Sequence, residues 1–297
     1  MKEKILITGF NGHIARKLNN FLDKNKYELN YLTTKKNECS TNVFYWDIQK
    51  HYIDPYALQD TKHIIHLAGF NISNRWSKNN KKVMFDSRIK SSQLLYNQCN
   101  KIKIKPETFI SASAMGYYGF NQTGLKDENT KHGNDWMSNL CVNWESMADQ
   151  FEKIGTRVCK LRFSLIIDEK SEIMKKINLG FKFRFGLIFG SGQQHFPWIH
   201  SNDICRFIQH IIQKNDIKGV FNIATPQNTS YLEFIKSIQL IRHPKSILIY
   251  VPKIIFDYIM PQKKNLLFND IKLCVNKMKS TGFNWKYKTI EDVIKKK

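Results

Sequence analysis

The stretch KILITGFNGHIA, residues 4–15, decides the fold. Its first residues form a short run of apolar and β-branched side chains, which is typical of a buried parallel strand. Gly9 and Gly12 follow, and the small Ala15 stands three residues further on. Gly9 permits a tight turn, Gly12 lets the backbone approach a pyrophosphate, and Ala15 allows a helix to pack closely on the strand. The spacing predicts a strand, a phosphate-binding turn and a helix whose first N–H groups face an anion.

Strand and helix patterns alternate through the first half of the chain. The predicted strands cover about 28–32, 63–67, 108–111 and 158–163, and the predicted helices cover about 81–99 and 137–153. Parallel strands joined by helices build a sheet that is covered on both faces. We therefore predict an α/β fold with a Rossmann-type, doubly wound parallel sheet.

The second half of the chain is less regular. We expect a long functional loop over 180–192, which is rich in Gly and Phe, then a strand over 220–223 and a helix over 231–238. The remaining residues carry weak periodicity and two prolines. This organisation predicts an NAD(P)-binding Rossmann domain with a substrate lobe over 1–245 and a small, mostly helical C-terminal domain over 246–297.

Composition narrows the classes of partner. The chain has 297 residues and a formal net charge of +22. Its basic residues are mostly scattered lysines without interleaved aromatics, so we expect a solvated surface and no specific nucleic-acid partner. No apolar run approaches the ~18 residues of a membrane span, and the start lacks a secretory pattern, which predicts a soluble cytoplasmic protein with no membrane partner. The six cysteines have no Cys-x-x-Cys spacing and no His at ligand spacing, so we expect no metal site.

The end of the second predicted strand bears on the choice of cofactor. An NAD enzyme usually places Asp or Glu there for the ribose 2′-hydroxyl, whereas hydroxyl and ammonium groups suit the 2′-phosphate of NADP. Thr33, Thr34, Lys35 and Lys36 stand there without an acid, which favours NADP over NAD. NAD remains the alternative, because the lysines belong to a lysine-rich chain and Glu38 lies close by in the sequence.

Several longer motifs point to a family. They are LAGFNI at 67–72, DSRI at 86–89, ISASAMGYYG at 110–119, and GSGQ at 190–193 followed by PWIH at 197–200. Together with the N-terminal stretch, they closely resemble the YfcH-type epimerase family. That family is an atypical subgroup of the extended short-chain dehydrogenase/reductases and has a small C-terminal domain of its own. The resemblance covers essentially the whole chain.

The resemblance implies a set of cofactor-binding residues, each carried over by motif. They are Gly9, Phe10, Asn11, Gly12, His13 and Ile14 around the pyrophosphate, Thr33 and Thr34 at the adenosine ribose, Leu67, Ala68 and Gly69 toward the nicotinamide ribose, and Arg88 from the following helix. The alternative for Arg88 is an ordinary cation on a helix surface.

The usual catalytic pair of extended short-chain reductases is absent from the matching helix. Leu140 and Trp144 stand where the resemblance places the Tyr and the Lys of Tyr-x-x-x-Lys, and neither can act as a general acid or base. Ser113 matches the Ser that hydrogen-bonds a substrate oxygen in active relatives. Tyr117 is the candidate substitute acid, with packing in a pocket wall as the alternative. We expect Glu145 to cap or solvate its helix.

Two hypotheses about function follow from the resemblance. The first is an NADP(H)-binding epimerase or oxidoreductase-like protein that acts on a small polar substrate, such as a sugar derivative, without the usual catalytic pair. The second is a largely non-catalytic NADP-binding sensor or regulator. In either case we expect a small-molecule partner, and the sequence predicts no particular oligomeric state.

Overall fold

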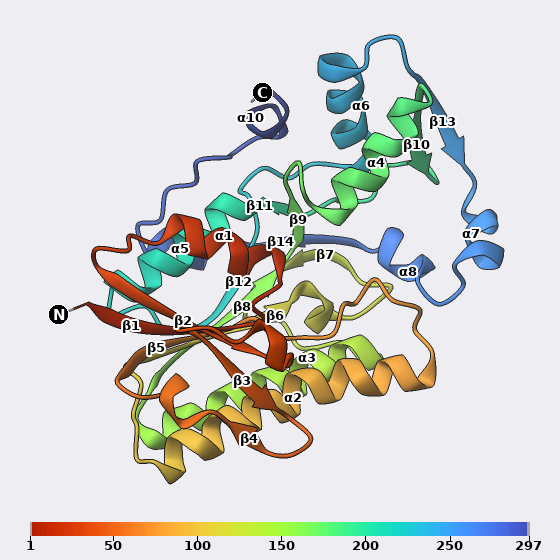
Figure 1. Ribbon diagram of the computed structural model, residues 1–297. Helices are drawn as coiled ribbons and strands as arrows, with labels where there is room; N and C mark the ends of the chain where they lie inside the picture. Colours follow the sequence, from red (N-terminus) through yellow and green to blue (C-terminus); the bar gives the residue numbers. More distant parts are fainter. Residues whose placement is uncertain (1, 296–297) are drawn as a thin grey trace. The chain divides into compact units, whose positions relative to one another are not determined.

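A computed structural model describes residues 2–295 and is built around an eight-stranded, mostly parallel sheet (Figure 1). The strand order is β12-β8-β6-β5-β1-β2-β3-β4. These strands are β1 (Glu3–Thr8), β2 (Tyr27–Thr33), β3 (Val43–Asp47), β4 (Tyr52–Ile53), β5 (Thr61–His66), β6 (Thr108–Ala114), β8 (Arg157–Phe163) and β12 (Gly219–Ile223). β1 pairs in parallel with both β2 and β5, and β4 is antiparallel to β3. The predicted α/β fold is confirmed.

The chain order reverses at the centre of the sheet. β2 and β3 follow β1 toward one edge, whereas β5 and β6 lie on the other side of β1. Ligands of open α/β sheets bind at such a switch point, outside the carboxyl ends of the strands. The predicted cofactor-binding residues 9–14, 33–34 and 67–69 lie at or just after the ends of β1, β2 and β5.

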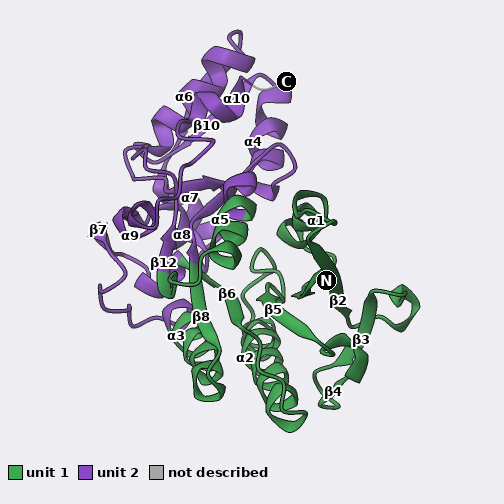
Figure 2. Ribbon diagram, turned by 90° about the vertical axis from the view of Figure 1, so that its left-hand side faces the viewer, with its two compact units in different colours: residues 1–114, 139–161, 205–220 green, residues 115–138, 162–204, 221–297 purple. Residues whose placement is uncertain are grey.

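The chain forms two compact units (Figure 2). The first contains residues up to 114, 139–161 and 205–220, and the second contains 115–138, 162–204 and the residues from 221 onward. The predicted domain boundary at 245/246 divides the chain at a single position, whereas each of these units consists of several separate segments. The predicted boundary stays a prediction. The described residues include no helix that is both long and apolar enough to cross a membrane.

The first unit carries helices on both faces of its strands (Figure 1). α1 (His13–Phe21) lies on one face, and α2 (Lys78–Lys101) and α3 (Trp136–Asp149, of which 139–149 belong to this unit) lie on the other. Its core includes Leu6, Leu95 and Phe109, all fully buried. Phe109 stacks on Phe151 with 3.8 Å between ring centroids, which fixes β6 against the residues that follow α3.

The second unit is assembled from smaller pieces. Its helices are α4 (Glu172–Lys182), α6 (Tyr231–Arg242), α7 (Lys253–Ile259), α8 (Lys264–Leu267), α9 (Asn276–Ser280) and α10 (Ile290–Ile294). Three two-stranded parallel sheets join β10 (Phe185–Phe189) to β13 (Ile247–Val251), β11 (Trp198–His200) to β9 (Leu165–Ile167), and β14 (Asp270–Leu273) to β7 (Thr123–Lys126). Beyond these, α5 (Ser201–Gln213) begins in this unit and continues into the first.

The predicted long loop over 180–192 is wrong. The segment contains the end of α4 and all of β10. Its glycines are there for packing: a Cβ on Gly180 would stand 2.9 Å from the Phe185 carbonyl oxygen, and one on Gly186 would stand 2.6 Å from the Leu248 side chain. Glycines that admit close neighbours and glycines that loosen a loop look alike in a sequence.

Candidate cofactor and active site

The glycine turn after β1 forms a close backbone cradle. Gly9 has a φ of +75°, and the Gly12 N–H donates to the Gly9 carbonyl at 2.7 Å. A Cβ on Gly9 would stand 3.0 Å from the Leu67 carbonyl oxygen, and a Cβ on Gly12 would stand 2.9 Å from the Gly9 carbonyl oxygen. α1 then begins at His13, with no side-chain cap on its N-terminus and no acid in its first turn. Such a turn fits a bound pyrophosphate, because no side chain of the protein caps the N-terminus of α1.

A buried histidine ties this turn to the end of β5. The Thr8 hydroxyl oxygen accepts the backbone N–H groups of Leu67 and Ala68, both at 3.0 Å, and lies 2.8 Å from His66 Nδ1. Because that oxygen already accepts two hydrogen bonds, its own proton donates to Nδ1. His66 Nε2 lies 3.1 Å from Ser91 Oγ, whose hydroxyl donates to a backbone carbonyl in α2 at 2.6 Å. The partners therefore assign the neutral tautomer with a proton on Nε2.

An acid lies at the end of β2, although residues 31–36 contain none. A short 3-10 helix, η1 (Lys36–Glu38), brings the Glu38 carboxylate to 2.8 Å from Thr33 Oγ1 and 2.9 Å from Asn11 Nδ2, and both of these groups donate to it. Lys35 Nζ is also 2.9 Å from the carboxylate. The hydrogen bond from Lys35, followed by the one from Thr33, holds the pKa of Glu38 below its usual value. The structure thus places a carboxylate and an ammonium side by side at the predicted ribose end.

The neighbouring predicted residues differ in what they offer. The Phe10 ring packs on Tyr31 with 5.3 Å between centroids, and the Ile14 side chain is buried, so Ile14 would serve a ligand only through its backbone. Thr34 is exposed. The backbone of 9–14 stays the predicted contact to the cofactor phosphates.

Arg88 is half-buried within the first unit. Its Nη1 donates to the backbone carbonyls of Phe70 and Met84, both at 3.1 Å, and its guanidinium carbon lies 5.0 Å from the Trp144 ring centroid. The same group fills the space beside Gly69, where a Cβ would stand 2.8 Å from it. Burial lowers the pKa of Arg88 to about 10, which leaves it charged at neutral pH. Contact with a cofactor stays a prediction for Arg88, as it does for the other residues of this set.

Ser113 and Glu145 form a buried pair. Ser113 stands near the end of β6, and its hydroxyl donates to a Glu145 carboxylate oxygen at 2.6 Å. Both residues are buried, so the expectation that Glu145 caps or solvates its helix is wrong. A signal existed: Glu145 follows Cys141 by four residues and precedes Ala148 by three, and both of these lie on the buried face of α3. Among the described residues, the buried Trp144 indole N–H has no hydrogen-bond partner.

Tyr117 belongs to the second unit, where it packs on a buried cation. Its ring centroid lies 3.4 Å from the guanidinium carbon of Arg162, which is 2% exposed. Arg162 also donates to the Tyr118 hydroxyl at 3.1 Å and to the Glu128 carbonyl at 3.2 Å. These contacts support the packing role of Tyr117, and its role as an acid stays a prediction. Sequence analysis missed Arg162, whose only signal is its position in the apolar run of β8.

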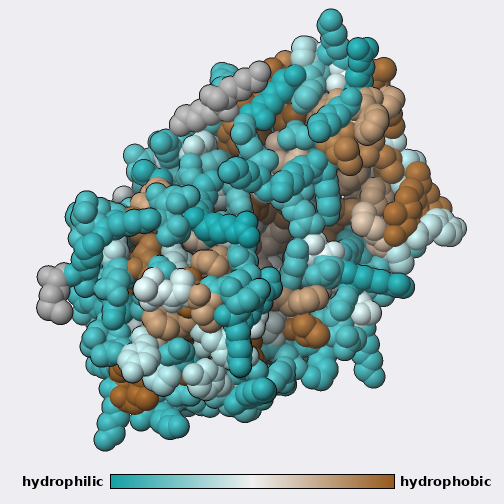
Figure 3. Space-filling view, in the orientation of Figure 1, coloured by the Kyte–Doolittle hydropathy of each residue, from teal (hydrophilic) through white to brown (hydrophobic). Residues whose placement is uncertain are grey.

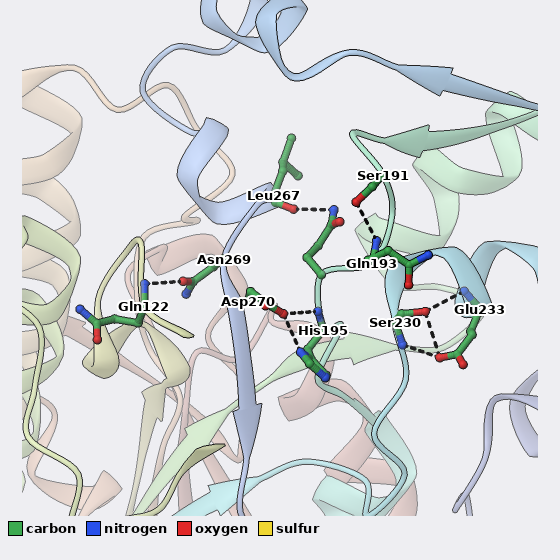
Figure 4. A network of polar contacts seen from close by, with 10 residues as sticks. Gln122, Ser191, Gln193, His195, Ser230, Glu233, Leu267, Asn269 and Asp270 are labelled. Carbon is green, nitrogen blue, oxygen red and sulfur yellow. Dashed lines mark hydrogen bonds and ion pairs between the residues drawn. The ribbon is translucent and has the colours of Figure 1, made fainter. Parts of the chain in front are cut away.

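A second polar cluster links the GSGQ motif to the C-terminal segment of the second unit (Figure 4). The Asp270 carboxylate accepts the His195 backbone N–H at 2.9 Å and lies 2.5 Å from His195 Nδ1. The His195 backbone N–H, as the main cause, holds the pKa of Asp270 below its usual value. Gln194 donates to the Leu267 carbonyl at 3.1 Å in the same cluster. These bonds fix the 190–195 loop to the segment that begins β14.

Comparisons with known proteins agree with this architecture. Residues 5–224 match the model of the NAD dependent epimerase/dehydratase family. An epimerase family protein of Staphylococcus haemolyticus is 30% identical, with 98% of this chain and 99% of that protein aligned. The human epimerase family protein SDR39U1 (isoform 2), solved with NADPH, matches with a TM-score of 0.85 and 23% identity over 98% of each chain. UDP-glucuronic acid 4-epimerase of Bacillus cereus, solved with NAD, matches with a TM-score of 0.76 and 19% identity over 98% of this chain and 94% of that one.

Proposed function

This chain belongs to the NAD dependent epimerase/dehydratase family, and we propose that it is a cytoplasmic protein that binds NADP(H) at the carboxyl ends of β1, β2 and β5. The observation that carries the proposal is the cradle at Gly9 and Gly12, where the backbone approaches itself so closely that side chains are excluded. The N–H groups at the start of α1 would hold the pyrophosphate. Leu67, Ala68 and Gly69 would contact the cofactor closer to its nicotinamide end.

The choice between the two dinucleotides depends on Glu38 and Lys35. The exposed Lys35 and Lys36 are the cations that a 2′-phosphate would meet, and NADPH is the ligand in the human structural neighbour. Glu38 favours NAD(H) as the second candidate, because a carboxylate accepts the ribose 2′-hydroxyl and repels a 2′-phosphate. We propose that the protein binds NADP(H) and that Lys35 then leaves Glu38 and pairs with the 2′-phosphate.

Titration with NADPH and NADH, followed by nicotinamide fluorescence, tests this proposal. We expect tighter binding of NADPH. Lys35→Gln should weaken NADPH by up to about fivefold and leave NADH unchanged, as expected for one exposed ion pair of about 1 kcal/mol. Glu38→Gln should strengthen NADPH binding, because it removes a carboxylate that repels a 2′-phosphate. Lys24→Gln is the matched control, since it removes an exposed lysine from a turn elsewhere in the first unit. Tighter binding of NADH would replace NADP(H) by NAD(H), and binding of neither would refute the proposal.

We further propose that the protein, with its cofactor bound, acts on a small polar substrate, such as a sugar derivative, through Ser113. A nicotinamide dinucleotide supplies, when bound, a hydride donor or acceptor. The Ser113 hydroxyl proton points to Glu145, which leaves the Ser113 oxygen free to accept a hydrogen bond from a substrate hydroxyl. As that hydroxyl is oxidised, its proton would pass to Ser113 while the Ser113 proton passes to Glu145. This pair would supply the proton acceptor that Leu140 and Trp144 do not provide.

The second candidate function is a non-catalytic NADP-binding sensor, favoured by the apolar Leu140 and the aromatic Trp144 at the positions of the usual pair. A screen of NADPH turnover with carbonyl compounds and nucleotide sugars separates the two. For an enzyme, we expect Ser113→Ala and Glu145→Gln each to lower turnover at least about tenfold, the value of one buried hydrogen bond of about 1.4 kcal/mol, without changing NADPH affinity. Ser111→Ala removes another buried hydroxyl from β6 and is the control. Tight NADPH binding without turnover across the panel would support the sensor instead.

A further inference from the structure

The two-stranded sheet of β10 and β13 is apolar on both faces. Ile188 points inward to the core of the second unit, and Gly186 lies against Phe181 and Leu248 on the same face. On the opposite face, Phe185 pairs with Ile247 and Leu187 pairs with Ile249 across the strands, and all four side chains are about 39–64% exposed. A strand at a protein surface normally alternates apolar and polar side chains. The outward row of this sheet is therefore exceptional.

α7 continues the apolar surface beyond β13. Phe256 is its buried anchor, packed against Phe189 and Phe268 with centroids 5.0 and 5.4 Å away. Ile254 and Tyr258 are 63% and 83% exposed. Figure 3 shows hydrophobic residues gathered at the right of the molecule, over β10, β13 and α7. We call Phe185, Leu187, Ile247, Ile249, Ile254 and Tyr258 the outer face.

The charges around the outer face are positive. Lys182 and Arg184 precede β10 and Lys245 precedes β13, so three exposed cations stand where the two strands begin. At the other end, Lys253 is exposed at the start of α7. The acid within α7, Asp257, is paired with Lys264. The outer face thus combines large apolar side chains with a cationic border.

We propose that the outer face binds the surface of an anionic lipid bilayer, with Ile254 and Tyr258 inserted at the level of the headgroups. Exposed aliphatic and Tyr side chains bordered by Lys and Arg are what an interfacial membrane site requires. Charge decides between occupants. A second copy would bring the same cationic border and another chain of net charge +22 to the contact, whereas an anionic bilayer neutralises both.

This binding would be peripheral. The described residues provide no helix able to span a bilayer, and the outer face consists of a sheet surface and a short helix. The sequence-based expectation of no membrane partner considered spanning segments alone. It treated 180–192 as a loop, and so it did not bring Phe185 and Leu187 alongside Ile247 and Ile249.

Cosedimentation of the full chain with vesicles tests the proposal. We expect binding to phosphatidylglycerol/phosphatidylcholine vesicles at 0.1 M salt, little binding to pure phosphatidylcholine, and release at high salt. The double variant Ile254→Ser/Tyr258→Ser should bind phosphatidylglycerol vesicles at least about tenfold more weakly, since it removes both inserted anchors. Leu125→Ser/Tyr56→Ser is the matched control, because Leu125 is also 63% exposed and Tyr56 is 70% exposed, and both lie outside the outer face.

A second pair of variants tests the cationic border. Lys182→Gln/Lys245→Gln should weaken vesicle binding more than Lys24→Gln/Lys26→Gln, which changes the net charge equally in the first unit. Thermal melting and NADPH titration should remain unchanged in every variant. Failure to bind phosphatidylglycerol vesicles would overturn the proposal, as would equal losses in the outer-face and control variants. Dimerisation in analytical ultracentrifugation that Ile254→Ser/Tyr258→Ser abolishes would assign the outer face to a second copy instead.

Discussion

Replacing Gly9 with alanine is expected to lower NADPH affinity by about a hundredfold, through the loss of one or two charge-assisted hydrogen bonds from the turn to the phosphates. Gly9 has a φ of +75°, and an added Cβ would stand 3.0 Å from the Leu67 carbonyl oxygen. The three nearest atoms all belong to the backbone of Leu67 and Ala68, so no flexible side chain can move aside and the turn itself must shift. The left-handed conformation alone costs an alanine about 1–3 kcal/mol.

Gly124→Ala isolates the close approach from the backbone strain. Gly124 has a nearly equal φ of +78°, but a Cβ there would have no neighbour within 4 Å. We expect Gly124→Ala to lower the free energy of unfolding by about 1–2 kcal/mol and to leave NADPH affinity unchanged. Denaturant melts and NADPH titrations of both variants provide the measurements. Equal NADPH affinity in Gly9→Ala and the parent protein would remove the 9–14 turn from the cofactor site.

The free energy of unfolding is expected to fall by about 3 kcal/mol between pH 6.5 and pH 4 because of His66 alone. Burial lowers the pKa of His66 from 6.5 to about 4. Below pH 6.5 the unfolded chain binds a proton that the folded chain does not, so stability decreases as pH falls. Below about pH 4 both states are protonated and the loss is complete. Protonation would also place a donor on Nδ1, which accepts the Thr8 hydroxyl proton in the neutral form.

Urea unfolding of His66→Gln as a function of pH measures this contribution. Whatever its stability at neutral pH, the variant should show a flatter decline between pH 6.5 and pH 4 than the parent protein. His51→Gln removes an exposed imidazole from the same unit and is the matched control. If stability declined equally steeply with pH in His66→Gln and the parent protein, folding would not lower the pKa of His66, against its burial and its assigned neutral tautomer.

The predictions from sequence are most accurate where structure depends on near neighbours. Several helices and strands of the first unit occupy the expected stretches, as α2 and β6 illustrate, whereas β3, β4 and α5 were not predicted. The 180–192 segment failed because its glycines face residues distant in sequence, Leu248 among them. Glu38 was noted as close in sequence, yet its approach to Asn11 depends on the path of η1. Charged side chains are seldom buried without partners. The partners of Glu145 and Arg162 lie on other elements, so the burial of Glu145 was mispredicted and Arg162 was missed.

The sequence by itself determined the glycine turn after β1, the alternation that builds the sheet, and the absence of Tyr and Lys from α3, because each depends on residues within a few positions of one another. The tertiary structure alone decided that Glu38 faces Thr33, that Ser113 donates to Glu145 across 32 residues, and that Phe185 and Leu187 lie beside Ile247 and Ile249. The physical reason is that burial and hydrogen bonding are settled by register and packing between elements. The linear sequence specifies this register and packing only through all of the core residues together.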